Sequence, residues 1–406
     1  MQSKINQILI SNRMLFIIGA VFILVSCTIN SGDNSQIEKN DRLLDAIQSA
    51  DLDKAQAAIH DGADVDAKWS DHDDMTSLML ATKKGLLNIV ELLLDCGADP
   101  NLKNTKDGAT ALILASGFGY SDIVKDLLEN GANVNDTQLD GTSAIVVASY
   151  YGHVEVVKIL LDTGANVDCK ESVQNVTALI NASSKGHADV VELLLGKGAN
   201  IEAKRSKNGA TALMKASQNG HADVVELLLA KGANIEAKGT KDSATALMLA
   251  SYNGHAKIVK LLLAKGANIE VKGTKDSATA LILASFNGHA KIVKLLLDKG
   301  VNTDHRETAN GNTSLVIASE KGHLDVVDLL LARGADVEER QTRNGATALM
   351  LASYNGHAKV VKLLLENGAD VNARTTDRLQ LTALGVANKA KKKAVSTILE
   401  EVGAVE

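Results

Sequence analysis

The sequence is poor in the residues that build linkers and large aromatic cores. It has one proline, Pro100, and aromatic residues make up 2% of its 406 positions. A proline-rich linker and a core of large rings are therefore excluded. The charges nearly balance, because 43 Lys and Arg stand against 49 Asp and Glu, giving a formal net charge of −6. With both signs interspersed, this balance argues against a nucleic-acid-binding protein.

Cysteine and the familiar catalytic motifs are also scarce. The three cysteines, Cys27, Cys96 and Cys169, are too few for a disulfide framework. The sequence holds no Gly-rich phosphate loop, no Ser-His-Asp set and no Cys-x-x-Cys pair. We therefore expect no catalytic residue, no cofactor and no enzymatic activity.

What the sequence does have is an internal period. A threonine opens each unit, at Thr76, Thr110, Thr142, Thr177, Thr211, Thr245, Thr279, Thr313, Thr347 and Thr382. From Thr177 to Thr347 the spacing is 34 residues five times in succession. Residues 235–268 and 269–302 differ at only five positions, which indicates an internal duplication. A fixed period of this length predicts a stacked solenoid, in which each unit packs only on its neighbours.

One unit, residues 240–272, predicts two short helices. Thr245 suits the N-cap of a first helix over residues 246–253, which Gly254 would end in the left-handed conformation. A second helix is predicted over residues 256–264, with a dense run of Ile, Val and Leu that must be buried on several sides. The polar connectors between units, rich in Gly, Asn and Asp, predict projecting hairpins.

These motifs resemble the ankyrin repeat, with its Thr-x-Leu start, its Gly-His pair, its Val-Val and Leu-Leu runs and its Gly-Ala-Asp or Gly-Ala-Asn end. The resemblance implies an all-α repeat solenoid of stacked helix-turn-helix units with projecting β-hairpin loops. It extends over residues 41–406: an N-terminal cap over 41–68, nine full repeats over about 69–375 and a C-terminal cap over 376–406. We expect a monomer.

Seven histidines recur at the Gly-His pair: His153, His187, His221, His255, His289, His323 and His357. Stacked helices lie roughly 10 Å apart, whereas the ligands of one zinc ion must each lie about 2 Å from it. The histidines therefore cannot share a metal, and we expect each ring to form a hydrogen bond with nearby backbone.

The first 26 residues differ from the rest of the chain. Lys4 and Arg13 precede an apolar run that ends in Leu24-Val25-Ser26-Cys27. This pattern resembles the signal peptide and lipobox of bacterial lipoproteins, in which the cysteine thiol accepts the lipid. We therefore expect a signal peptide over 1–26, lipidation at Cys27 and a flexible tether over 27–40. Ordinary cleavage, an uncleaved anchor and a chance match are the alternatives.

Most aromatic residues after Cys27 occur at one place in the repeat, in the two positions before the glycine that ends the first helix. They are Phe118, Tyr150, Tyr151, Tyr252, Phe286 and Tyr354. These positions resemble the variable positions that line the partner-binding groove of ankyrin proteins. Aromatic rings are favoured at binding surfaces. The alternatives are local packing and copying by duplication. Basic residues at the loop tips would assist binding, namely Lys106, Lys207, Lys241, Lys275 and Arg343.

The combined pattern indicates a lipid-anchored scaffold that binds protein partners in the bacterial envelope. The anchor would lie outside the cytoplasm, in the outer membrane and facing the periplasm or the exterior. One alternative is a surface-exposed or released factor that acts on proteins of a host or competitor cell. Another is a periplasmic accessory protein that supports an envelope or oxidative-stress enzyme.

Overall fold

The computed structural model describes residues 35–274 and 276–406. The described residues form two compact units, one of residues 35–148 and 153–166 and the other of residues 149–152 and 167–406. The predicted signal peptide, Cys27 and residues 28–34 of the predicted tether lie outside the described residues, as does Lys275.

The first unit is built of helix pairs and one short hairpin. Its elements are a helix over residues 35–48, α2 (Leu52–His60), β1 (Lys68–Trp69), η1 (Ser70–His72), β2 (Met75–Thr76), α3 (Ser77–Lys83), α4 (Leu87–Asp95), α5 (Ala111–Phe118), α6 (Ser121–Glu129), most of α7 (Ala144–Tyr151) and α8 (Val154–Asp162). Residues 149–151 of α7 belong to the second unit.

The tether prediction was too long at its C-terminal end, because residues 35–40 are already helical. Their helix continues to residue 48 and buries Leu43, Ala46 and Ile47 completely. The side chain of Gln36 also donates to the carbonyl of Gly62, at 3.0 Å. Tertiary contacts therefore order a polar segment that its composition alone did not identify as helical.

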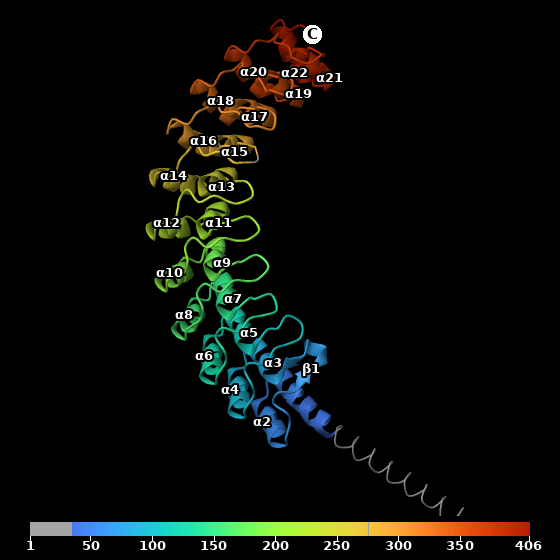
Figure 1. Cartoon of the computed structure of the whole chain (residues 1–406). Coiled ribbons are helices and arrows are strands. Elements are labelled where there is room, and N and C mark those ends of the chain that lie inside the picture. The colour runs from blue at the N-terminus through green and yellow to red at the C-terminus, as the bar shows by residue number, and fades with distance from the viewer. Residues whose placement is uncertain (1–34, 275) are drawn as a thin grey trace, which may run out of the picture. The chain divides into compact units, whose positions relative to one another are not determined.

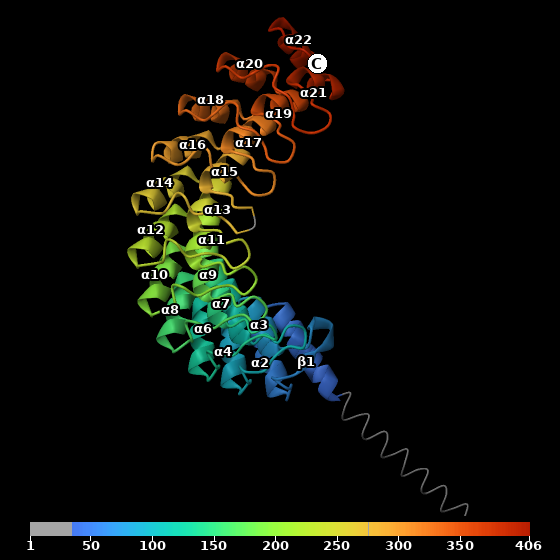
Figure 2. The same ribbon diagram turned by 45° about the horizontal axis from the view of Figure 1, so that its top comes forward.

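The second unit repeats the same pair of helices. Its remaining elements are α9 (Ala178–Lys185), α10 (Ala188–Gly196), α11 (Ala212–Asn219), α12 (Ala222–Ala230), α13 (Ala246–Tyr252), α14 (Ala256–Ala264), α15 (Ala280–Phe286), α16 (Ala290–Leu297), α17 (Ser314–Lys321), α18 (Leu324–Ala332), α19 (Ala348–Asn355), α20 (Ala358–Glu366), α21 (Ala383–Lys389) and α22 (Lys393–Glu401). Within this unit the odd-numbered helices form one layer and the even-numbered helices another (Figures 1 and 2). The fold class predicted from the sequence is confirmed.

The first helices begin where the threonines predict. In α13 the Oγ1 of Thr245 accepts the N–H of Met248, and the same contact recurs at the start of the other odd-numbered helices of the second unit. The prediction fails at Thr142, because α7 begins at Ala144 and places Ser143 in the N-cap position. The preceding connector is shorter than its counterparts, so the threonine lies one residue outside the helix.

The two helices of a repeat bury different side chains. In α14, Ile258, Val259 and Leu262 are no more than 1% exposed, and each fully buried aliphatic side chain stabilises the fold by about 1.5–3 kcal/mol. In α13 the buried positions include the small residues Ala250 and Ser251. Small side chains allow neighbouring first helices to approach closely, as their sequence predicts.

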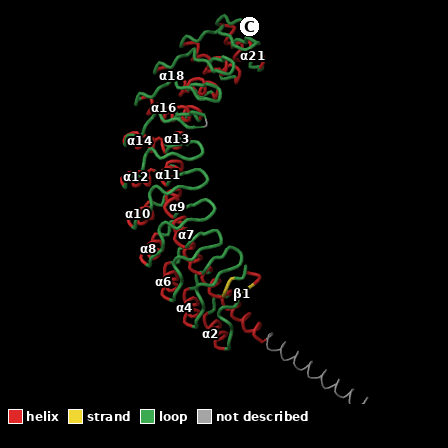
Figure 3. The backbone as a smooth tube through the Cα atoms, in the orientation of Figure 1, coloured by secondary structure: helices red, strands yellow, loops and turns green. Residues whose placement is uncertain are grey.

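The connectors project as loops beside the first helices of each unit (Figure 3). In the described residues, β structure is limited to the β1–β2 pair and three isolated bridges. Most loops are closed by single backbone hydrogen bonds, such as that from the N–H of Gly239 to the carbonyl of Ala244, at 3.0 Å. Adjacent loops are also joined, as where the N–H of Thr240 donates to the carbonyl of Asn208, at 2.9 Å.

None of the helices within residues 35–274 and 276–406 combines the length and apolar character needed to cross a membrane.

One second helix carries a carboxylate at a position that the other repeats fill with Leu or Ile. Asp126 in α6 corresponds to Leu261 of α14, and its Oδ2 is buried without a hydrogen-bond partner. Burial raises the pKa of Asp126 above its ordinary value of 3.8, and the neighbouring carboxylates of Glu91 and Glu129 raise it further. The ionised form is therefore unfavourable in the folded protein.

Replacing this residue by the consensus leucine, Asp126→Leu, should increase the free energy of unfolding at pH 7 by about 1 kcal/mol. The folded-state pKa lies above the unfolded value, so protonation stabilises the folded wild type on acidification. The gain from Asp126→Leu should thus be complete above the raised pKa and shrink as the pH falls through it. Urea denaturation across this pH range measures the difference. Asp189→Leu, at an exposed position in the first turn of α10, is the control and should give no gain.

Candidate functional site

The ends of seven first helices, the odd-numbered helices from α5 to α17, are each held by a histidine of the following repeat. The Nε2 atoms of the seven Gly-His histidines donate to backbone carbonyls 36 or 37 residues earlier, at 3.0–3.1 Å. In the second unit these carbonyls include those of Tyr150, Tyr252 and Phe286. The prediction of a backbone hydrogen bond is confirmed, and its acceptor lies in the preceding repeat.

The glycine that ends each of these seven helices leaves room for the ring. Gly322 has a φ of +78°, and a Cβ added to it would lie 2.5 Å from Nδ1 of His357. Glycine is needed here for two reasons, the left-handed backbone and the space that the imidazole occupies. Together they fix the backbone of the two residues before the glycine, which are the positions where the aromatic residues occur.

All six aromatic residues singled out in the sequence are substantially exposed at the ends of their helices. The exposed fractions are 48% for Phe118, 39% for Tyr150, 57% for Tyr151, 47% for Tyr252, 42% for Phe286 and 53% for Tyr354. Phe118 belongs to the first unit and the others to the second. None of the six rings is buried in the core, and their role in binding stays a prediction, as does the alternative of local packing.

Several of these rings have local partners. Phe118 stacks on Tyr120 with ring centroids 5.6 Å apart, and Tyr150 meets Tyr151 edge to face at 5.0 Å. The ammonium groups of Lys185 and Lys321 lie over the rings of Tyr150 and Phe286, at 4.3 and 4.8 Å. Among the described residues, Tyr252 and Tyr354 stack on no other ring. Within the part of the chain that the structure describes, no cation lies over either of these two rings.

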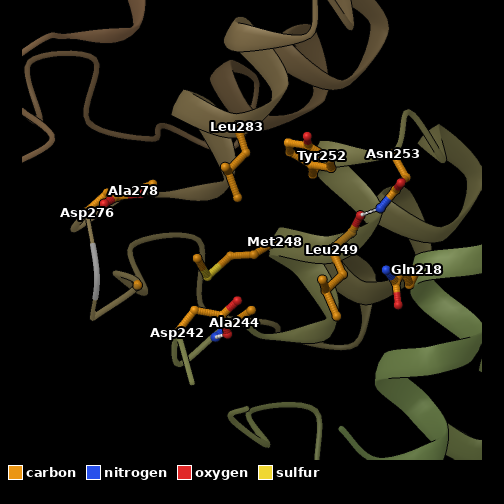
Figure 4. A pocket seen from close by; sticks show the side chains of 11 residues that line it. Gln218, Asp242, Ala244, Met248, Leu249, Tyr252, Asn253, Asp276, Ala278 and Leu283 are labelled. Carbon is orange, nitrogen blue, oxygen red and sulfur yellow. Dashed lines mark hydrogen bonds between the residues drawn. The ribbon is translucent and has the colours of Figure 1, made fainter. Parts of the chain in front are cut away.

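A pocket of about 360 Å³ lies beside Tyr252. Figure 4 shows the ring of Tyr252 on the helix side with Leu249 and Leu283, whereas Asp276 and Ala278 come from the loop before α15. The walls are thus apolar on the helices and mixed on the loops. Asn253 closes one end, where its Nδ2 donates to the carbonyl of Leu249 at 2.8 Å.

A second pocket, of about 500 Å³, adjoins the first and extends past Phe286 toward Glu320 and Lys321. The two pockets share four lining residues: Tyr252, Asp276, Ala278 and Leu283. We call their combined surface, between the first helices α13, α15 and α17 and the loops before them, the aromatic groove. Each of the two pockets has a volume in the range of small-ligand sites.

The basic loop residues fall into two groups. Lys106, in the first unit, forms an ion pair with Asp73 at 3.0 Å. Lys207, Lys241 and Arg343, in the second unit, are exposed.

Sequence reasoning missed the residues that the loops contribute to the groove wall, including Asp242 and Asp276. The sequence alone does not identify these residues, because it does not show which loop lies beside which helix.

Metal chemistry finds no structural support in the described part of the chain. Within it, no group of three or more His, Cys, Asp or Glu side chains is arranged to hold a metal ion. The recurring histidines instead bond the backbone between repeats.

The fold and the groove together define a helical repeat protein with its candidate binding surface on the first helices and loops. The comparison with protein families agrees, because the model of three ankyrin repeats matches residues 43–138, 135–205, 202–273 and 271–341. The single ankyrin-repeat model matches residues 344–376. The chain belongs to the ankyrin-repeat family. A search among curated proteins gave no match.

Proposed function

We propose that this protein is a lipid-anchored scaffold of the bacterial envelope that binds protein partners through the aromatic groove. Ankyrin-repeat proteins are typically interaction scaffolds rather than enzymes. The observation that carries the proposal is the exposure of Tyr252 and Phe286 along two adjoining pockets. Aromatic side chains offer a large contact area at a small entropic cost, so they are the residues that binding surfaces favour.

The proposed anchor is the lipidated thiol of Cys27. The apolar run before it is too short for a spanning helix and suits a signal peptide. Several acyl chains on one residue would provide stable attachment, which a single chain does not. Under this proposal the array is held outside the cytoplasm as a monomer, with no nucleic-acid partner.

The groove is tested by replacing its two aromatic residues together with the equivalent exposed ring on α19, as Tyr252→Ala, Phe286→Ala and Tyr354→Ala. Binding to the partner should weaken at least about tenfold, because exposed aromatic anchors contribute much of the binding free energy. The far-UV circular dichroism melt should stay nearly unchanged, since none of the three rings is buried. The partner is first identified by placing a photo-crosslinking amino acid at position 252 in intact cells.

A matched control replaces one exposed lysine on the second helix of each of the same repeats, Lys257→Ala, Lys291→Ala and Lys359→Ala. This control should bind the crosslinked partner as the wild type does. If the aromatic variant retains full affinity, the groove is not the binding surface. If the crosslinker captures the same protein equally well from position 257, contact at position 252 is not specific.

A further inference from the structure

Two cations lie side by side in the second unit without an anionic partner. Arg205 is in the loop before α11, and Lys215 is on α11 itself. Both are partly buried, and among the described residues neither forms an ion pair. The guanidinium donates to Oε1 of Gln174, and Nζ of Lys215 donates to Oε1 of Gln218 at 2.7 Å. Neutral amide oxygens are thus their only side-chain acceptors.

Both residues occupy repeat positions whose equivalents in a later repeat line the aromatic groove. Two repeats further along the chain, their counterparts are Gly273 and Leu283, and both of these line the pocket beside Tyr252. Gln218, which holds the Lys215 ammonium, also lines that pocket. The cation pair therefore lies at the end of the pocket, about one repeat from Tyr252.

The local electrostatics leave this pair without compensation. Burial lowers the pKa of Lys215, and the charge of Arg205 lowers it further. The buried Nε–H of Arg205 has no acceptor. The carboxylates in the adjoining loops are already engaged with backbone N–H groups: Glu171 accepts from Val173 and Gln174, and Asp242 accepts from Ala244. Two like charges in a poorly hydrated position attract an external anion strongly.

The sequence shows that the cations are not needed for folding. The position of Lys215 is Leu249 or Leu283 in the next two repeats, and the position of Arg205 is Gly239 or Gly273. An aliphatic side chain and a glycine therefore fit these places in the same fold. A pair of cations that the scaffold does not require is more simply explained by a ligand.

We propose that Arg205 and Lys215 form a carboxylate-binding subsite, which receives an Asp or Glu side chain of the partner protein while a neighbouring apolar residue of that partner occupies the pocket beside Tyr252. This inference rests on the proposed binding function of the groove and names its partner's chemistry. Arginine forms bidentate hydrogen bonds with carboxylates, and the lysine adds a second charge. Asp276 on the pocket's loop wall disfavours an acidic residue beside Tyr252. Charge therefore determines which residue of the partner lies beside the cation pair and which lies beside Tyr252.

The spacing of the two subsites predicts a sequence pattern in the partner. Adjacent helices in a stack are roughly 10 Å apart, and an extended peptide advances about 3.3 Å per residue. The acidic residue should therefore lie about three positions from the apolar one.

The test is selection of random displayed peptides of about 12 residues, long enough to span both subsites at about 3.3 Å per residue, on the full-length protein. The wild type should enrich peptides with Asp or Glu about three positions from a large apolar residue. In anisotropy titrations of an enriched peptide, replacing its acidic residue by Asn should weaken binding about tenfold at low salt, and less at high salt.

The matched variant carries Arg205→Gly and Lys215→Leu, the residues of the next two repeats. It should keep the apolar preference and lose the acidic one, so that the Asn peptide and its acidic parent bind equally. Control substitutions Lys231→Ala and Lys265→Ala, at exposed positions just after α12 and α14, change the net charge by the same amount and should leave the acidic preference intact.

Four results would overturn the subsite. The wild type and the Arg205→Gly, Lys215→Leu variant could enrich the same peptides. Inorganic phosphate could compete better than glutarate, which would assign the pair to a phosphate group. Enrichment of apolar peptides without acidic residues would overturn the subsite alone, whereas no enrichment by a folded wild type would overturn the proposed function with it.

Discussion

Replacing Gly322 by alanine should lower the free energy of unfolding by about 3–4 kcal/mol. About 1–2 kcal/mol comes from placing a Cβ in a left-handed conformation. The remainder comes from the His357 ring, because the new Cβ would lie 2.5 Å from Nδ1 and the ring must move. Moving it breaks the hydrogen bond from Nε2 to the carbonyl of Glu320, worth about 1 kcal/mol, and disturbs packing between repeats.

The same repeat supplies the control. Gly334 has a φ of +81°, close to that of Gly322, but an added Cβ there would meet nothing within 4 Å. Gly334→Ala should therefore lower the free energy of unfolding only by the contribution of the left-handed backbone, about 1–2 kcal/mol. Chemical denaturation of both variants separates the two contributions. If both variants lose the same free energy of unfolding, the contact with the imidazole does not contribute to stability.

A double-mutant cycle isolates this contact further. His357→Ala removes the ring and its hydrogen bond, so Gly322→Ala should cost much less in that background than in the wild type. We expect a coupling free energy on the order of 1–2 kcal/mol. Additive effects would mean that the glycine is required for its backbone conformation alone.

Replacing Cys27 by alanine should abolish lipidation completely. The thiol of Cys27 is the nucleophile that would accept the lipid, and no other group at this position can replace it. The variant should take up no labelled palmitate and remain as a precursor that still carries residues 1–26. Metabolic labelling followed by gel electrophoresis measures both effects, and the wild-type chain should partition into the detergent phase.

Cys96→Ala is the matched control for this experiment. Cys96 is an exposed free thiol in the first unit, so it tests whether any accessible cysteine takes up the label. The Cys96→Ala protein should be labelled and processed as the wild type is. Palmitate incorporation into the Cys27→Ala protein would refute the anchor and leave the array without its proposed attachment.

The helix ends were predictable because their causes are local. Thr245 caps a helix that begins at the next residue, and Gly266, two residues past the last residue of α14, has the positive φ that glycine permits. The capping failed at Thr142, where a connector of different length moved the threonine outside the helix. Local capping rules therefore predict the helix ends correctly where the period is regular. Where a connector changes length, they place the helix start at the wrong residue.

The binding surface was only half predictable. The aromatic positions could be read from the repeat, since each precedes a glycine that ends a helix. Their neighbours could not, because the pocket beside Tyr252 joins residues from Gln218 to Leu283, across three repeats. The cation pair could not be predicted for the same reason, because only the fold brings Arg205 and Lys215 together and joins Lys215, through Gln218, to the pocket beside Tyr252.

The hydrogen bonds between repeats also bear on how the array can change length. Each such repeat offers one imidazole donor and one carbonyl acceptor, and the two serve different neighbours. Inserting a whole unit adds one of each, so every existing group still finds a partner and none is left buried and unpaired. The near-identity of residues 235–268 and 269–302 is the expected trace of such an insertion. Gain or loss of part of a unit would break this balance, so selection acts on length in steps of a whole repeat.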